Sequence, residues 1–223
     1  MNKKLLSVSI VLSLFISIFS LQSAQGDINS AITYLKTKSP NPWISMALVA
    51  NGETPNVDYL KSTTGAKATD YEAPILALTA VGYDPRTFAT ENLVEKLKAF
   101  YSNNQIGDAS IINDDIFGIL ALISAGESIN DLVVEGAKNF ISQNQKSDGG
   151  WPFAVGADSD TNMTAMAIMA LLETGVSKTD VSITKAIQYL KNAQNSDGGF
   201  PYDPKSPWGT DSDASSDAWI ISA

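Results

Sequence analysis

One group of acidic residues has the spacing of a metal-binding loop. Asp158, Asp160 and Asn162 stand at alternate positions, as oxygen ligands do in many calcium loops. Such a loop needs a glycine for its sharp turn, and this chain has Met163 at the position that follows. An acidic or hydroxyl side chain directly before an apolar helix also caps the helix N-terminus, a role that suits Asp160 or Thr161. We therefore expect a helix cap here and no metal ion.

A second acidic pair, Asp114 and Asp115, opens another segment with helical periodicity. Two carboxyl groups that face a cavity could serve as a general acid and a general base. The start of a helix also stabilises negative charge through the helix dipole. Asp70 stands at the equivalent place in the preceding repeat, and such recurrence is typical of a structural role. We favour helix capping for this pair, with acid–base chemistry as the alternative.

The composition excludes several kinds of chemistry. The 223 residues include no histidine and no cysteine, which rules out Cys/His zinc sites, thiol nucleophiles and a Ser-His-Asp triad. The single arginine, Arg86, follows Asp84-Pro85 and is interpreted as a turn residue. With 24 acidic and 15 basic residues, the chain lacks the basic surface that nucleic acid requires. We predict no catalytic residue, no cofactor, no metal and no nucleic-acid partner.

Residues 1–26 have the features of a secretory signal peptide. Lys3 and Lys4 precede an uncharged, largely apolar run over residues 5–21, and Ala24-Gln25-Gly26 follows it. We expect cleavage after Gly26 and a protein that is secreted or held at the cell surface. The alternative is an uncleaved membrane anchor, because the run approaches the length of a spanning helix.

Residues 145–153 recur as residues 194–202. The corresponding positions are Gln145, Gly149 and Trp151 in the first copy and Gln194, Gly198 and Phe200 in the second. Each copy lies between two segments with helical periodicity. Fainter helix pairs precede them, at residues 28–38 with 43–50, 57–62 with 70–81, and 92–104 with 114–125.

The two helices of each pair differ in polarity. The first is amphipathic, whereas the second is apolar nearly all round, which is typical of a helix buried on all sides. A glycine follows the second helix, as Gly82 and Gly175 do, in the position that a left-handed cap favours. We predict an all-α fold of five helical hairpins in two concentric layers, without strands. The last hairpin stops short of its expected glycine, so we expect the domain over residues 27–223 to be incomplete.

The repeated element resembles the QW repeat of squalene–hopene cyclases, within the prenyltransferase and squalene-cyclase superfamily. This resemblance implies an α/α toroid. It also implies that the glutamine bonds backbone groups at the end of the outer helix and that the aromatic residue covers the junction. The chain is similar in style to exported bacterial repeat proteins without an assigned activity.

The chain departs from the enzymes of that superfamily at their reactive groups. Alignment on Thr164-Ala165 places Asp160 and Asn162 in the Asp-x-Asp-Asp motif of the cyclases, with Asn162 where the proton donor is expected. An amide cannot protonate an alkene. Protein prenyltransferases hold zinc with a cysteine, a histidine and an aspartate, and the first two are absent here.

Several aromatic residues lie near the starts of the inner helices and could line the rim of a ligand pocket. The candidate rim residues are Trp43, Tyr71, Phe117, Asp160, Asn162 and Trp219. Such a rim would stack sugars or isoprenoid chains, and the alternative is that the aromatic residues only fill the hairpin junctions.

The sequence therefore favours an exported, non-catalytic binding or scaffold module. Its partner would be a small molecule, a glycan or a protein at the cell surface, with membrane contact only through an uncleaved anchor. One alternative is a small-molecule or isoprenoid carrier that resembles the helical half of vitamin B12 carriers. Another is a terpene-cyclase-related or carbohydrate-active enzyme that uses carboxylates.

Overall fold

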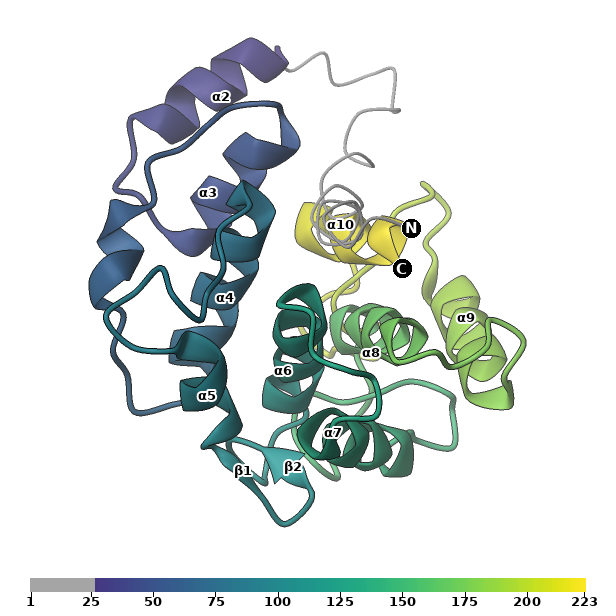
Figure 1. Cartoon of the computed structure of the whole chain (residues 1–223). Coiled ribbons are helices and arrows are strands. Elements are labelled where there is room, and N and C mark those ends of the chain that lie inside the picture. The colour runs from purple at the N-terminus through teal and green to yellow at the C-terminus, as the bar shows by residue number, and fades with distance from the viewer. Residues whose placement is uncertain (1–26) are drawn as a thin grey trace.

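A computed structural model of the protein describes residues 27–223, and the expected signal peptide lies outside these residues. Five helical hairpins follow one another around an open ring (Figure 1). The inner helices are α3 (Pro42–Ala50), α4 (Thr69–Val81), α6 (Asn113–Ser124), α8 (Thr161–Glu173) and α10 (Ala214–Ser222). The outer elements are α2 (Ile28–Lys36), the 3₁₀ helix η2 (Asp58–Ser62), α5 (Leu93–Lys98), α7 (Leu132–Gln143) and α9 (Val181–Ala193).

The inner helices form a continuous layer, in which each packs against the next along the chain. Their burial follows from their composition: α8 is buried along nearly its whole length, whereas α9 buries one face through Ile183, Ala186 and Leu190. A helix without a polar face is stabilised by burial on every side, and an amphipathic helix packs against it from outside with its apolar face. The expected all-α, two-layer toroid architecture is confirmed.

The inner helices end as expected. Gly82 follows α4 with φ of +95°, and Gly175 follows α8 with φ of +85°. A side chain at such a position would clash with its own backbone, so glycine closes the helix at the lowest conformational cost.

The third outer helix is shorter than predicted. Helix α5 ends at Lys98, and the chain then forms a small antiparallel hairpin of β1 (Tyr101–Ser102) and β2 (Gln105–Ile106). Asn103 and Asn104 form the turn with φ of 52° and 61°. Consecutive left-handed residues are characteristic of a tight hairpin turn, in which asparagine is favoured. The prediction of a helix over residues 92–104 without strands was therefore wrong in its second half.

No helix among residues 27–223 is long and apolar enough to cross a bilayer.

Candidate functional site

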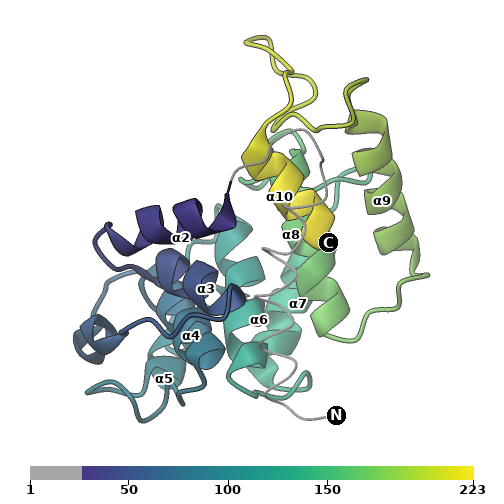
Figure 2. The same cartoon turned by 90° about the horizontal axis from the view of Figure 1, so that it is seen from above.

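Three aromatic side chains from three inner helices meet inside the ring; we call Trp43, Phe117 and Trp219 the aromatic triad. Their ring centroids lie 5.7 Å (Trp43–Phe117), 6.0 Å (Phe117–Trp219) and 6.4 Å (Trp43–Trp219) apart, all edge to face. The three parent helices, α3, α6 and α10, are not consecutive in the inner layer, whose helices Figure 2 shows from above. The ring contacts therefore join helices that do not follow one another along the ring. Trp43 keeps 41% of its surface exposed, so the triad remains reachable from solvent.

The other three candidate rim residues lie elsewhere. Tyr71 is buried, packs against Phe100 at 5.8 Å and donates its hydroxyl to the carbonyl oxygen of Gly65. Asp160 caps α8, because its carboxylate accepts from the backbone N–H of Met163 at 2.7 Å. Asn162 lies in the first turn of the same helix. The structure thus brings three of the six predicted rim residues into mutual contact.

The buried position of Asp160 at the start of α8 raises the pKa of its carboxyl group. The side chain is 4% exposed, and burial raises the pKa of this carboxyl to about 6. The expected capping role is confirmed by the hydrogen bond to Met163. The described residues contain no group of three or more acidic side chains arranged to hold a metal ion.

The repeated glutamines hold the turns together. The Gln145 side-chain amide donates to the carbonyl oxygen of Gly149 and to that of Ser182, both at 2.8 Å, and thereby ties its turn to the next hairpin. Gln194 makes the equivalent bond to the carbonyl of Gly198 at 2.8 Å. Trp151 is fully buried and donates its indole N–H to the carbonyl of Ile141 at 2.7 Å, whereas Phe200 remains partly exposed.

A second recurring bond joins each of these loops to its inner helix. The backbone N–H of Trp151 donates to the Thr164 hydroxyl at 3.0 Å, and that of Phe200 donates to Asp217 at 2.8 Å. One repeat earlier, the N–H of Ile106 donates to Asp115 at 2.8 Å. Asp115 thus holds the preceding loop by a hydrogen bond, from a position in the first turn of α6.

This observation corrects the capping interpretation of Asp114 and Asp115. The residue at the cap of α6 is Ile112, which makes no side-chain cap bond. Asp114 instead accepts from the N–H of Asp108 at 3.0 Å, and Asp70 accepts in the same way from Ala66 and Lys67. The carboxylates of Asp114 and Asp115 therefore both accept from the loop that precedes α6, and the predicted capping role was wrong.

A further carboxyl, which was not predicted from the sequence, lies near this pair: Glu72 in the first turn of α4. Burial and the nearby charges of Asp114 and Asp115 raise the pKa of Glu72 to about 9. Burial likewise raises the pKa of Asp115 to about 8. One carboxyl oxygen on each of the three residues, and the side-chain oxygen of Gln105, has no hydrogen-bond partner among residues 27–223. A second carboxyl in the first turn of an inner helix, after Asp70, was the signal that could have revealed this cluster.

Two of these carboxyls, those of Glu72 and Asp115, are closed off from solvent. Glu72 is 2% exposed and Asp115 is fully enclosed. Since a general acid must come within hydrogen-bond distance of the reacting atom, their position favours a structural role.

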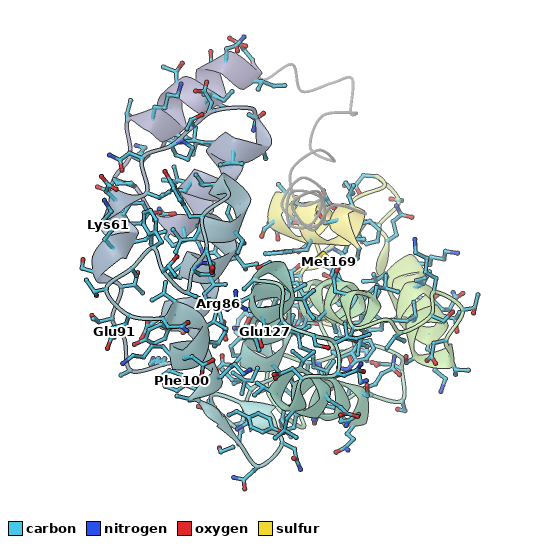
Figure 3. The ribbon with its side chains drawn as sticks, in the orientation of Figure 1. Lys61, Arg86, Glu91, Phe100, Glu127 and Met169 are labelled. Atoms are coloured by element: carbon cyan, nitrogen blue, oxygen red, sulfur yellow. The ribbon has the colours of Figure 1, made fainter. Side chains whose placement is uncertain are left out.

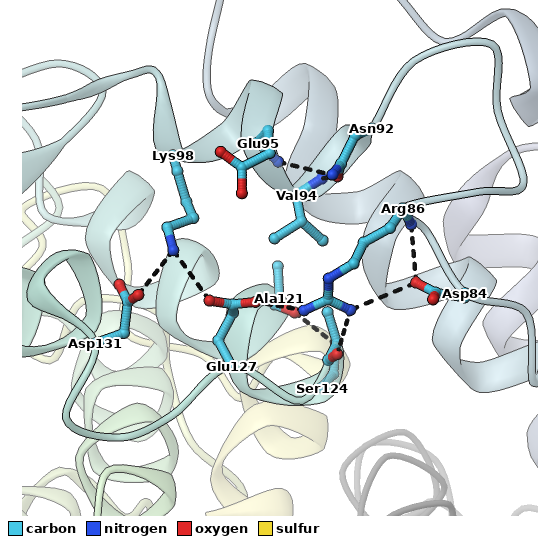
Figure 4. Close-up of polar contacts among 11 residues, drawn as sticks. Asp84, Arg86, Asn92, Val94, Glu95, Lys98, Ala121, Ser124, Glu127 and Asp131 are labelled. Atoms are coloured by element: carbon cyan, nitrogen blue, oxygen red, sulfur yellow. Dashed lines mark hydrogen bonds and ion pairs between the residues drawn. The ribbon is translucent and has the colours of Figure 1, made fainter.

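Arg86 is engaged in a network between the second and third hairpins (Figures 3 and 4). Its guanidinium pairs with Glu127 and donates to the carbonyl of Ala125 at 2.8 Å. Lys98 joins the same network through Glu127 at 3.0 Å and Asp131 at 2.7 Å. The backbone N–H of Arg86 also donates to Asp84, which supports the predicted turn.

The fold resembles two solved structures at low sequence identity. Protein geranylgeranyltransferase-I of Candida albicans, complexed with GGPP, superposes with a TM-score of 0.69 at 14% identity, over 98% of this chain and 82% of that one. The ent-copalyl diphosphate synthase of Streptomyces platensis gives a TM-score of 0.63 at 14% identity, over 97% of this chain and 49% of that one. No curated protein matches the sequence. The family model of the prenyltransferase alpha-alpha toroid domain matches residues 58–210, and the chain therefore belongs to this family.

Proposed function

We propose that the protein is an exported, non-catalytic binding module that takes an apolar, isoprenoid-like chain at the aromatic triad. The observation that carries the proposal is the meeting of Trp43, Phe117 and Trp219, with Trp43 41% exposed. Edge-to-face aromatic rings present a broad apolar surface to a ligand. Export rests on the charge and hydropathy pattern of residues 1–26.

The engagement of the single arginine favours an uncharged ligand. The only guanidinium group, that of Arg86, is engaged by Glu127 and Ala125 and is not available to grip a diphosphate. The geranylgeranyltransferase of similar fold is complexed with GGPP. We expect an isoprenoid alcohol to suit the present chain better than its diphosphate.

Binding is favoured over catalysis by the state of the acidic residues. Asp160 is committed to the cap of α8, and Asn162 beside it is an amide. Glu72 and Asp115 are enclosed in the interior. None of these residues offers an accessible carboxylic acid, which the alternative of a carboxylate-dependent enzyme would require.

The test is a titration of the mature protein with farnesol and with farnesyl diphosphate, followed by quenching of tryptophan fluorescence. Phe117→Ala removes one ring of the triad and leaves all four tryptophans as reporters. We expect this variant to bind farnesol about tenfold more weakly, which corresponds to about 1.4 kcal/mol of lost contact. The control is Phe153→Ala, which removes a partly exposed ring outside the triad and should leave farnesol binding unchanged.

Absence of saturable farnesol binding by the wild-type protein would overturn the isoprenoid proposal and favour a scaffold. Export is tested separately by the mass of the protein recovered from the secreting cell. A chain that begins at Asp27 supports cleavage, and retention of residues 1–26 contradicts it.

A further inference from the structure

A cavity of about 420 Å³ lies at the junction of the second, third and fourth hairpins, apart from the aromatic triad. It is bounded by residues 66–69 before and at the start of α4, by Phe100 and Phe153, and by five residues before and at the start of α6, namely Gly107, Asp108, Ile111, Asn113 and Asp114. Its volume is in the range of small-molecule pockets, about 300–1,000 Å³.

Two aromatic rings form apolar walls of this cavity. Phe100 belongs to the chain just after α5, and Phe153 belongs to the loop before α8. Phe153 is 45% exposed, which leaves part of its ring free for a ligand. The loop of Phe153 is fixed in place, because its carbonyl oxygen accepts from the backbone N–H of Ile112 at 3.0 Å.

The remaining lining mixes hydrogen-bond donors with acceptors. Lys67 supplies an ammonium group, Asn113 an amide and Asp108 a carboxylate. The N–H and O–H groups of Ser110 donate to Asp108 at 2.9 and 2.7 Å and lower the pKa of its carboxyl. Asp108 is therefore ionised at neutral pH and is a strong acceptor.

The part of the lining formed by the start of α6 is rigid and polar. Asp114 is 4% exposed; one of its carboxyl oxygens is held by the N–H of Asp108, and the other has no partner among the described residues. Gly107 has φ of +73°, and a Cβ there would lie 2.2 Å from the Asp114 carboxylate. Only glycine allows the loop to approach Asp114 so closely, and this approach fixes the position of Asp108.

We propose that this cavity is a second binding site, which takes a pyranose ring of a saccharide. Sugar hydroxyls both donate and accept, which matches a lining of Lys67, Asn113 and Asp108. The C–H face of a sugar ring packs against an aromatic side chain such as Phe153. An anion such as phosphate would be repelled by Asp108 and Asp114, and a plain hydrocarbon chain would leave the polar lining unsatisfied.

The test uses the mature protein and three probes: maltotriose, cellotriose and tri-N-acetylchitotriose. Binding is measured by saturation-transfer NMR and calorimetry at millimolar sugar. We expect at least one trisaccharide to bind. Phe153→Ala and Lys67→Met should each weaken its binding about tenfold, because they remove the stacking face and a hydrogen-bond donor. Phe153 is 45% exposed and Lys67 is exposed, so circular dichroism should show an unchanged fold for both variants.

The matched control is Phe117→Ala, which lies in the aromatic triad and should leave saccharide binding unchanged. Failure of all three sugars to bind the wild-type protein would overturn the proposal. Binding that survives both Phe153→Ala and Lys67→Met would also overturn it, because the sugar would then lie elsewhere. Since Phe117→Ala and Phe153→Ala exchange roles between the farnesol and saccharide titrations, the two proposals can fail independently.

Discussion

Replacement of Glu72 by glutamine should change how the stability of the protein depends on pH. The wild-type carboxyl is 2% exposed and faces Asp114 and Asp115, with a pKa raised from 4.5 to about 9. Between these two values the folded chain keeps a proton that the unfolded chain has released. The contribution of Glu72 to the free energy of unfolding is therefore most favourable below about pH 4.5, and it declines as the pH rises toward 9.

The size of the effect follows from linkage. One proton held only by the folded state changes the free energy of unfolding by about 1.4 kcal/mol per pH unit. From pH 6 to pH 8, Glu72 should therefore cost the wild-type protein about 3 kcal/mol, a large share of the 5–15 kcal/mol typical of a domain. Glutamine cannot ionise, and its NH₂ group can donate to the carboxyl oxygens that lack a partner. Glu72→Gln should thus reduce this slope by about 1.4 kcal/mol per pH unit, while Asp115 keeps its own contribution, and the variant should be the more stable protein at pH 8.

The assay is urea unfolding, followed by circular dichroism at pH 6, 7 and 8. Glu135→Gln, which changes an exposed glutamate on α7, is the control for the loss of one negative charge. Parallel stability curves for wild type and Glu72→Gln would refute the reasoning, because they would mean that Glu72 is ionised in the folded protein.

Three further predictions concern the repeated turns and are tested by the same unfolding measurement. Gly149→Ala should lower the free energy of unfolding by about 3 kcal/mol, because φ is +93° and the new Cβ would lie 2.6 Å from the Lys185 carbonyl oxygen. Its repeat partner Gly198→Ala has φ of +91° but nothing within 4 Å, so it should cost only about 1 kcal/mol; equal losses would contradict the contact. Gln145→Ala should cost about 2 kcal/mol, since two backbone carbonyls lose their donor, and a neutral result would show that water replaces the amide. Trp151→Phe should lower the free energy of unfolding by about 1 kcal/mol or more, because the indole hydrogen bond is lost and the ring is smaller. An unchanged urea midpoint would show that neither the bond nor the ring size matters for stability.

The fold could be predicted from the sequence where local and global signals agree. The apolar inner helices, the glycines that end them and the Asp160 cap all express short-range preferences that packing reinforces. The region after α5 was missed because Asn103 and Asn104 favour a hairpin turn, whereas the residues before them have helical spacing. There the turn preference outweighs the helical pattern.

The candidate site was less predictable because it depends on contacts between distant segments. Periodicity indicates that Trp43, Tyr71 and Phe117 lie near inner-helix starts. It does not show which of these side chains point toward the centre of the ring. Tyr71 turns outward to Phe100, whereas Phe117 turns inward to the two tryptophans. The grouping of Glu72 with Asp114 required the relative rotation of α4 and α6, which no short-range pattern contains.

The bond from Gln145 to Ser182 has a consequence for the order in which the molecule opens. It ties the fourth hairpin to the fifth, whereas the equivalent Gln194 bonds within its own turn. At the other end, α2 buries no residue. Segments with few buried side chains open most often, and segments held by bonds between hairpins open least often. Amide hydrogen exchange should therefore be faster in α2 than in α4, α6 and α8, whose side chains are largely buried, so that the first hairpin opens before the centre of the described chain.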